Sequence, residues 1–279
     1  MIAVVFAAGS AEGESSAIDR KGVQRTAFWE FKQDAGSHRD NEATSLRGEF
    51  KTRVADIDVT YQLAKMRLTL DQLNNGVYFG FPFTTLNVGD SDAVSHEFRL
   101  NSTGTGPLRW VAGVYKFDED IFRRAAYTTY VTAPFGQFNI VLPFLATLNN
   151  KSTAAFGQAT YAVRDDTRLI VGVRRTRDRK SGYDPLSGEA AVPPATESSK
   201  AYSEDVRFNN TSWKLGIDHD LRPNVMVYGS ISTGYKAGGF NAERDTGVYR
   251  PETLKAYEAG IKGRFLDNRL QLSANVFHY

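Results

Sequence analysis

Residues 228–279 constrain the fold most, because their strand-forming stretches alternate apolar residues with small or polar ones. In the stretch that begins at Val225, one set of alternate positions is mainly apolar. That set is Val225, Val227, Gly229, Ile231, Thr233 and Tyr235. Successive side chains of a β-strand point to opposite faces, so each such strand has one apolar and one polar face. The alternation by itself does not show whether the apolar face meets lipid or a protein core.

Runs of strand-forming residues bounded by Gly, Pro, Asn and Asp clusters predict about eleven strands along the chain. Their expected spans are 23–33, 43–53, 59–70, 94–101, 107–117, 151–163, 168–178, 210–219, 224–236, 253–264 and 268–279. Most are longer than a typical globular strand and close to the roughly 9–11 residues that cross a bilayer at a tilt.

The connections between these strands alternate between short and long. The short ones are 54–58, 102–106, 164–167, 220–223 and 265–267, and the long ones are 34–42, 71–93, 118–150, 179–209 and 237–252. An up-and-down barrel in an outer membrane has tight turns at one rim and long loops at the other. A sandwich with Greek-key connections has no reason to keep this parity. We therefore predict an all-β, antiparallel, up-and-down transmembrane β-barrel, with the long loops outside the cell.

The composition excludes several functions. The 34 basic and 32 acidic residues leave a net charge of +2, and no basic run is interleaved with stacking aromatics, so we expect no nucleic-acid partner. There is no Cys, and the four histidines lack the spacing of a zinc site, so we expect no metal site and no cofactor. No Ser has a nucleophile-elbow context, and nothing indicates an enzyme.

The chain has no apolar run of the roughly 18 residues that a membrane helix needs. Its mean hydropathy of −0.39 still permits a barrel, whose inner face is polar. Residues 1–9 are apolar but lack the basic start of a signal peptide, so we expect them to be an internal piece of a longer protein.

The candidate ligand-binding residues lie on the inner face and at the mouth of the predicted barrel. Arg174 is expected on the inner face, and Lys236 and Asn241 at the external mouth. Arg174 belongs to the densest basic stretch, residues 174–180, which could meet lipopolysaccharide phosphates, attract an anionic ligand, or simply be a solvated strand end. Several aromatic residues are expected to face outward near the strand ends as interfacial belts. They are Tyr115, Phe117, Tyr161, Trp213 and Tyr235.

Several motifs together resemble the barrel of TonB-dependent outer-membrane receptors. They are HEFRL at 96–100, PLRWVAGVY at 107–115, AFGQATY at 155–161, GVR at 172–174, STGYKAGGFN at 232–241, YRPE at 249–252, YEAGIK at 257–262 and NRL at 268–270. The resemblance is clear over residues 94–279, whereas residues 1–93 are similar only in strand pattern.

The resemblance implies a barrel of about 22 strands with an N-terminal plug in its lumen. It also implies uptake of a scarce ligand, most often a ferric siderophore, with energy from the TonB complex, in contact with outer-membrane lipid and lipopolysaccharide. This chain departs from the family in three ways: no plug sequence, no TonB box and an odd strand count. We therefore expect residues 1–279 to be a single, partial barrel domain that is not competent alone, because lipid cannot satisfy its unpaired edges.

Two alternatives remain at this point. The first is a passive porin-like or adhesin barrel that needs no plug. The second is a soluble all-β domain that binds carbohydrate on exposed aromatics. In the soluble domain, Leu169, Val171 and Val173 would be protected from solvent.

Overall fold

The structure is a computed structural model that describes residues 3–14, 36–78, 81–131, 138–185, 202–240, 248–267 and 269–279. These residues form strands and turns. Within these ranges, no helix is long and apolar enough to span a membrane.

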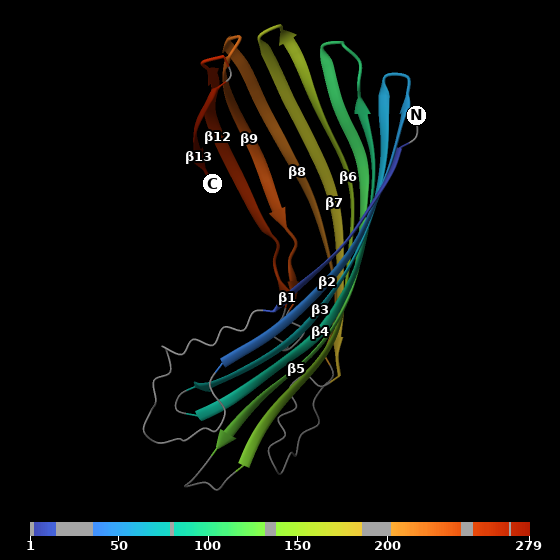
Figure 1. Ribbon diagram of the computed structural model, residues 1–279, viewed down its shortest axis with the longest axis vertical. Helices are drawn as coiled ribbons and strands as arrows, with labels where there is room; N and C mark the ends of the chain where they lie inside the picture. The colour runs from blue at the N-terminus through green and yellow to red at the C-terminus, as the bar shows by residue number, and fades with distance from the viewer. Residues whose placement is uncertain are drawn as a thin grey trace.

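Eleven strands form one antiparallel sheet in which every strand pairs with its neighbour in chain order, apart from the insertion of a small hairpin, β10–β11, between β9 and β12. The strands are β1 (Ala3–Glu14), β2 (Gly36–Val54), β3 (Ile57–Tyr78), β4 (Phe81–Ser102), β5 (Leu108–Val131), β6 (Phe138–Arg164), β7 (Thr167–Asp184), β8 (Tyr202–Arg222), β9 (Val225–Lys236), β10 (Gly239–Phe240), β11 (Val248–Tyr249), β12 (Glu252–Phe265) and β13 (Leu270–His278). The sheet is curved and open, with the short turns at the top of Figure 1. The predicted all-β, up-and-down antiparallel fold is confirmed.

The strands are longer than predicted. β6, for example, has 27 residues instead of the 13 expected at 151–163, and β5 continues to Val131. These extensions lie on the long-loop side, so the loops expected at 71–93 and 118–150 are mostly strand. The extensions carry no apolar alternation that would reveal a strand. Polar residues occupy consecutive positions at Asp118–Glu119–Asp120 in β5, whereas residues 138–145 of β6 are apolar at most consecutive positions.

The first strand also differs from the prediction. β1 pairs with β2, with Ala3 opposite Lys51, although no strand was expected there. The strand expected at 23–33 lies outside the described residues.

The two faces of the sheet differ in exposure and in chemistry. Along β7, the side chains from Leu169 to Arg179 alternate between exposed and half-buried, as expected for the convex and concave sides of a curved sheet. The convex positions Leu169, Val171 and Val173 are 42–53% exposed. The convex face changes from apolar to basic at Arg175. We refer to these exposed apolar convex positions near the short turns, which occur on β2 to β9, β12 and β13, as the outer apolar band.

No large apolar side chain is buried among the described residues. The buried apolar side chains are four alanines, Ala93, Ala125, Ala146 and Ala154. A soluble domain gains its stability by burying large apolar side chains, which this sheet leaves on its surface. The exposure of Val171 and its neighbours therefore favours a barrel wall whose convex side meets lipid.

The turn between β2 and β3 contains one strained residue. Ala55 has a φ of 50°, a left-handed conformation that costs an L-residue about 1–2 kcal/mol. We expect Ala55→Gly to raise the free energy of unfolding by about 1 kcal/mol, as measured by urea titration in detergent micelles. The control is Ala64→Gly, within β3, which should lower the free energy of unfolding by about 0.5–1 kcal/mol. Equal destabilisation by both substitutions would contradict the strain at Ala55.

Candidate functional site

Arg174 lies on the concave face of β7, as predicted, and contacts two aromatic rings. Its guanidinium carbon is 5.5 Å from the ring centroid of Tyr115 on β5 and 5.7 Å from that of Phe156 on β6. Both distances are within the range of cation–π attraction, which extends to about 6 Å. The Nε atom also donates a hydrogen bond to Thr176 Oγ1 at 3.3 Å. The sequence predicted the face of Arg174 but not these ring contacts.

The register of the sheet places Phe156 and Arg174 in one row across the concave face. The row passes through Lys51, Thr60, Arg99, Gly113, Phe156, Arg174 and Ser212, on β2 to β8. Gly113 provides space for the Phe156 ring, because a Cβ atom at residue 113 would lie 2.6 Å from Phe156 Cζ. The glycine therefore allows the ring to lie close to the wall beside Arg174.

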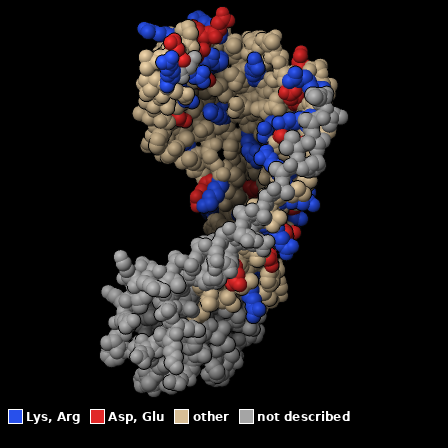
Figure 2. Space-filling view, in the orientation of Figure 1, with Lys and Arg blue, Asp and Glu red and all other residues tan. Residues whose placement is uncertain are grey.

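The cations of this row differ in how they are neutralised. Arg99 pairs with Glu97, and Lys51 lies 2.9 Å from Glu49 Oε2. Among the described residues, no carboxylate forms an ion pair with Arg174. Its cation therefore stays available to an anion that reaches the concave face, with ring faces beside it. Figure 2 shows a hollow in the molecule, where Lys and Arg side chains, with some Asp and Glu, lie among uncharged ones.

Of the other two predicted residues, the structure describes only Lys236, and it does not place Lys236 beside Arg174. Lys236 is the last residue of β9, and its Nζ lies 3.6 Å from Glu252 Oε1 on β12. Both side chains are 74% exposed, so this pair is solvated and weak. Asn241 lies outside the described residues.

The segment after β9 packs onto the concave face near the long-loop end. Phe240 contacts the backbone of β7, because a Cβ atom at Gly182 would lie 2.5 Å from Phe240 Cε2. The Tyr235 hydroxyl donates a hydrogen bond to Asp178 Oδ2 at 3.0 Å. The sequence predicted only a bend at Gly238, not the aromatic contacts.

Gly238 should be needed for this packing. A Cβ atom at residue 238 would lie 2.8 Å from Phe208 Cε1 and would also crowd the Tyr249 carbonyl oxygen. We expect Gly238→Ala to destabilise the packed β10–β11 hairpin by about 1–3 kcal/mol, which limited proteolysis would detect as faster cleavage in the 237–252 loop. The control is Gly106→Ala, where an added Cβ meets nothing within 4 Å. Equal cleavage rates in both variants would rule out this role for Gly238.

The basic stretch at 174–180 is divided between the two faces. Arg174 and Lys180 are concave, whereas Arg175, Arg177 and Arg179 are convex and lie just beyond the outer apolar band. Arg179 Nε donates to Asp205 Oδ1 at 3.0 Å, and this bonding holds the pKa of Asp205 below its usual range. The ion pair should therefore persist at neutral and mildly acidic pH and be lost only as the pH falls through that lowered pKa.

The predicted aromatic belts are partly wrong. Trp213 and Tyr161 face outward, at 36% and 48% exposure. Tyr115 and Phe117 instead lie on the concave face, in register with Ala154 and Ser152, and Tyr235 turns inward to Asp178. Apolar residues occupy both faces of β5, so the residue pattern of this strand could not distinguish its outward face from its inward face.

In the described part of the chain, no group of three or more His, Cys, Asp or Glu could hold a metal ion.

Comparison with solved structures shows the same fold. The ferric yersiniabactin uptake receptor FyuA from Yersinia pestis matches with a TM-score of 0.72 at 16% identity, over 87% of this chain and 36% of that one. The siderophore receptor PiuA from Acinetobacter baumannii matches with a TM-score of 0.70 at 17% identity, over 88% and 40%. The copper transporter OprC matches with a TM-score of 0.62 at 18% identity, over 99% and 42%.

This chain thus spans less than half the length of each of these structures. A family model described as "TonB dependent receptor-like, beta-barrel" matches residues 7–279. The chain therefore belongs to the TonB-dependent receptor β-barrel family.

Proposed function

We propose that this chain is part of the barrel wall of an outer-membrane receptor that imports a ferric siderophore with energy from the TonB complex. The observation that carries the proposal is Arg174, an inward-facing cation that lies beside two aromatic rings and pairs with no carboxylate among the described residues. A guanidinium binds carboxylate and similar oxygens through two parallel hydrogen bonds, and flat rings stack on planar ligand groups. Together they suit an anionic iron chelate with planar or aromatic parts.

The similar structures support an iron chelate as the ligand class. FyuA takes up ferric yersiniabactin, and PiuA is a siderophore receptor. The proposed role is transport and not catalysis.

The proposed extent of the chain follows from its coverage of these structures. Residues 1–279 are a single portion of a barrel domain, and a longer receptor supplies the other strands and the plug. The chain is a fragment in this sense and is not a transporter by itself. Its outer apolar band meets outer-membrane lipid, and the convex Arg175 and Arg177 meet lipopolysaccharide phosphates beyond that band.

The test is iron-limited growth of a strain that makes no siderophore of its own. The receptor that carries this segment should restore growth on at least one ferric siderophore, and deletion of tonB should abolish the effect. A passive porin-like barrel, the first alternative, predicts growth that does not depend on TonB. Failure on every ferric siderophore, or growth without TonB, would contradict the proposal.

A further inference from the structure

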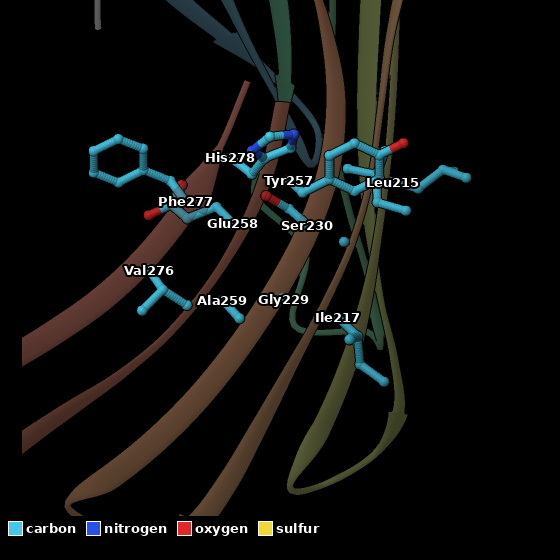
Figure 3. Close-up of a pocket in the computed structure, with 12 residues that line it drawn as sticks. Leu215, Ile217, Gly229, Ser230, Tyr257, Glu258, Ala259, Val276, Phe277 and His278 are labelled. Atoms are coloured by element: carbon cyan, nitrogen blue, oxygen red, sulfur yellow. The ribbon is translucent and has the colours of Figure 1, made fainter. Parts of the chain in front are cut away.

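The convex face of β8, β9, β12 and β13 contains a groove of about 700 Å³. Figure 3 shows Ile217 and Val276 on opposite sides of Gly229 and Ala259. These four residues are direct neighbours in the register, one on each strand. Two large side chains thus form the sides of the groove and two small residues form its floor.

The glycine in the floor has no packing role that would explain it. A Cβ atom at residue 229 would meet only the Glu258 carbonyl oxygen, at 3.9 Å. A larger side chain could therefore stand there without a clash, and its absence leaves the groove open. The groove lies within the outer apolar band, where the convex face of a barrel meets lipid chains.

The end of the groove nearer the long loops is polar and basic. Tyr257 and His278 line this end, with their ring centroids 6.5 Å apart. Lys255, the next convex residue along β12, places its Nζ 5.9 Å from the Tyr257 ring centroid. Among the described residues, no carboxylate pairs with Lys255. The apolar groove therefore ends at a cation and two hydrogen-bonding side chains, at the external border of the outer apolar band.

We infer that this groove holds one acyl chain of a phosphorylated glycolipid of the outer leaflet, with its phosphate against Lys255. An apolar groove alone does not select one lipid over another, because lipid chains are as apolar as the protein side chains. Selection comes from the headgroup, through the charge of Lys255 and the polar tips of Tyr257 and His278. The convex Arg175 and Arg177 lie at the same border and favour a lipid with several negative groups. The inference rests on the proposed outer-membrane location but not on the imported ligand.

The test is native mass spectrometry of the detergent-purified receptor that carries this segment, titrated with lipid A and separately with phosphatidylglycerol. Lipid A should bind more tightly than phosphatidylglycerol. Lys255→Gln should weaken lipid A binding about fivefold, the effect of one basic side chain at a lipid surface. Gly229→Leu should also weaken it, because the new side chain fills the floor.

Matched controls separate the groove from the rest of the surface. Lys65→Gln and Arg67→Gln remove exposed basic side chains on β3, four strands from β7; both should leave lipid A affinity unchanged. Lys255→Gln changes an exposed side chain and keeps the test valid if Gly229→Leu fails to fold. Equal binding of both lipids would overturn the glycolipid assignment, and unchanged affinity in Lys255→Gln would overturn the site. Ferric siderophore binding by the same samples tests the proposed function separately.

Discussion

Arg174→Gln is expected to weaken binding of the imported ligand by about ten- to a hundredfold, the usual loss when a hydrogen bond to a charged group is removed. Arg174 is the concave cation whose described partners are Thr176 and the rings of Tyr115 and Phe156. Glutamine keeps a polar side chain but loses the charge and the paired donors. The measurement is ligand affinity of the purified receptor by fluorescence quenching, with the siderophore that supports growth.

The neighbouring residue provides a control of the same chemistry on the opposite face. Arg175 is convex, and its Nη1 donates to Thr211 Oγ1 at 2.7 Å. Arg175→Gln should leave ligand affinity unchanged. Arg174→Lys keeps the charge but loses the planar guanidinium group. Its ligand affinity should therefore lie between those of the wild type and Arg174→Gln. Equal losses in Arg174→Gln and Arg175→Gln would rule out a specific contact at Arg174.

Val171→Arg is expected to destabilise folding into the membrane by about 2–4 kcal/mol, the cost of a basic side chain on the lipid face of a barrel near mid-depth. Val171 lies within the outer apolar band, with a convex residue of the same kind on either side along β7. The long side chain can reach water only by extending past these neighbours. The measurement is a urea titration of refolding into lipid vesicles.

The adjacent position again separates the two faces. Ile170 is concave, so an arginine there meets the water-filled lumen and avoids the lipid penalty. Ile170→Arg should lose clearly less stability than Val171→Arg. The soluble-domain alternative predicts no dependence on lipid for either variant, and equal losses in vesicles would contradict the assignment of faces.

The strand order could be predicted because two local signals agree. Alternation identifies strands such as β7, where Leu169, Val171 and Val173 are followed by Arg175, and this also gave the correct face for Arg174. Each predicted short connection overlaps a turn that joins neighbouring strands, for example Ala55 and Asp56 between β2 and β3. Antiparallel neighbours in chain order follow from such tight turns.

The contacts of the site could not be predicted, because they depend on register between strands far apart in sequence. The Tyr115 and Phe156 rings reach Arg174 only because β5, β6 and β7 align Gly113, Phe156 and Arg174 in one row. The pairing of Lys236 with Glu252 likewise needs the register of β9 with β12. A single sequence contains no direct signal for either alignment.

The central claim is that one face of this sheet meets lipid and the other meets water. Because the chain contains no Cys, single-cysteine variants at positions 169 to 175 can be labelled without background. With a water-soluble maleimide that does not cross membranes, applied to protein in lipid vesicles, we expect labelling at Ile170, Gly172, Arg174 and Arg175. We expect none at Leu169, Val171 and Val173. Labelling at all seven positions, or with the opposite alternation, would contradict the account.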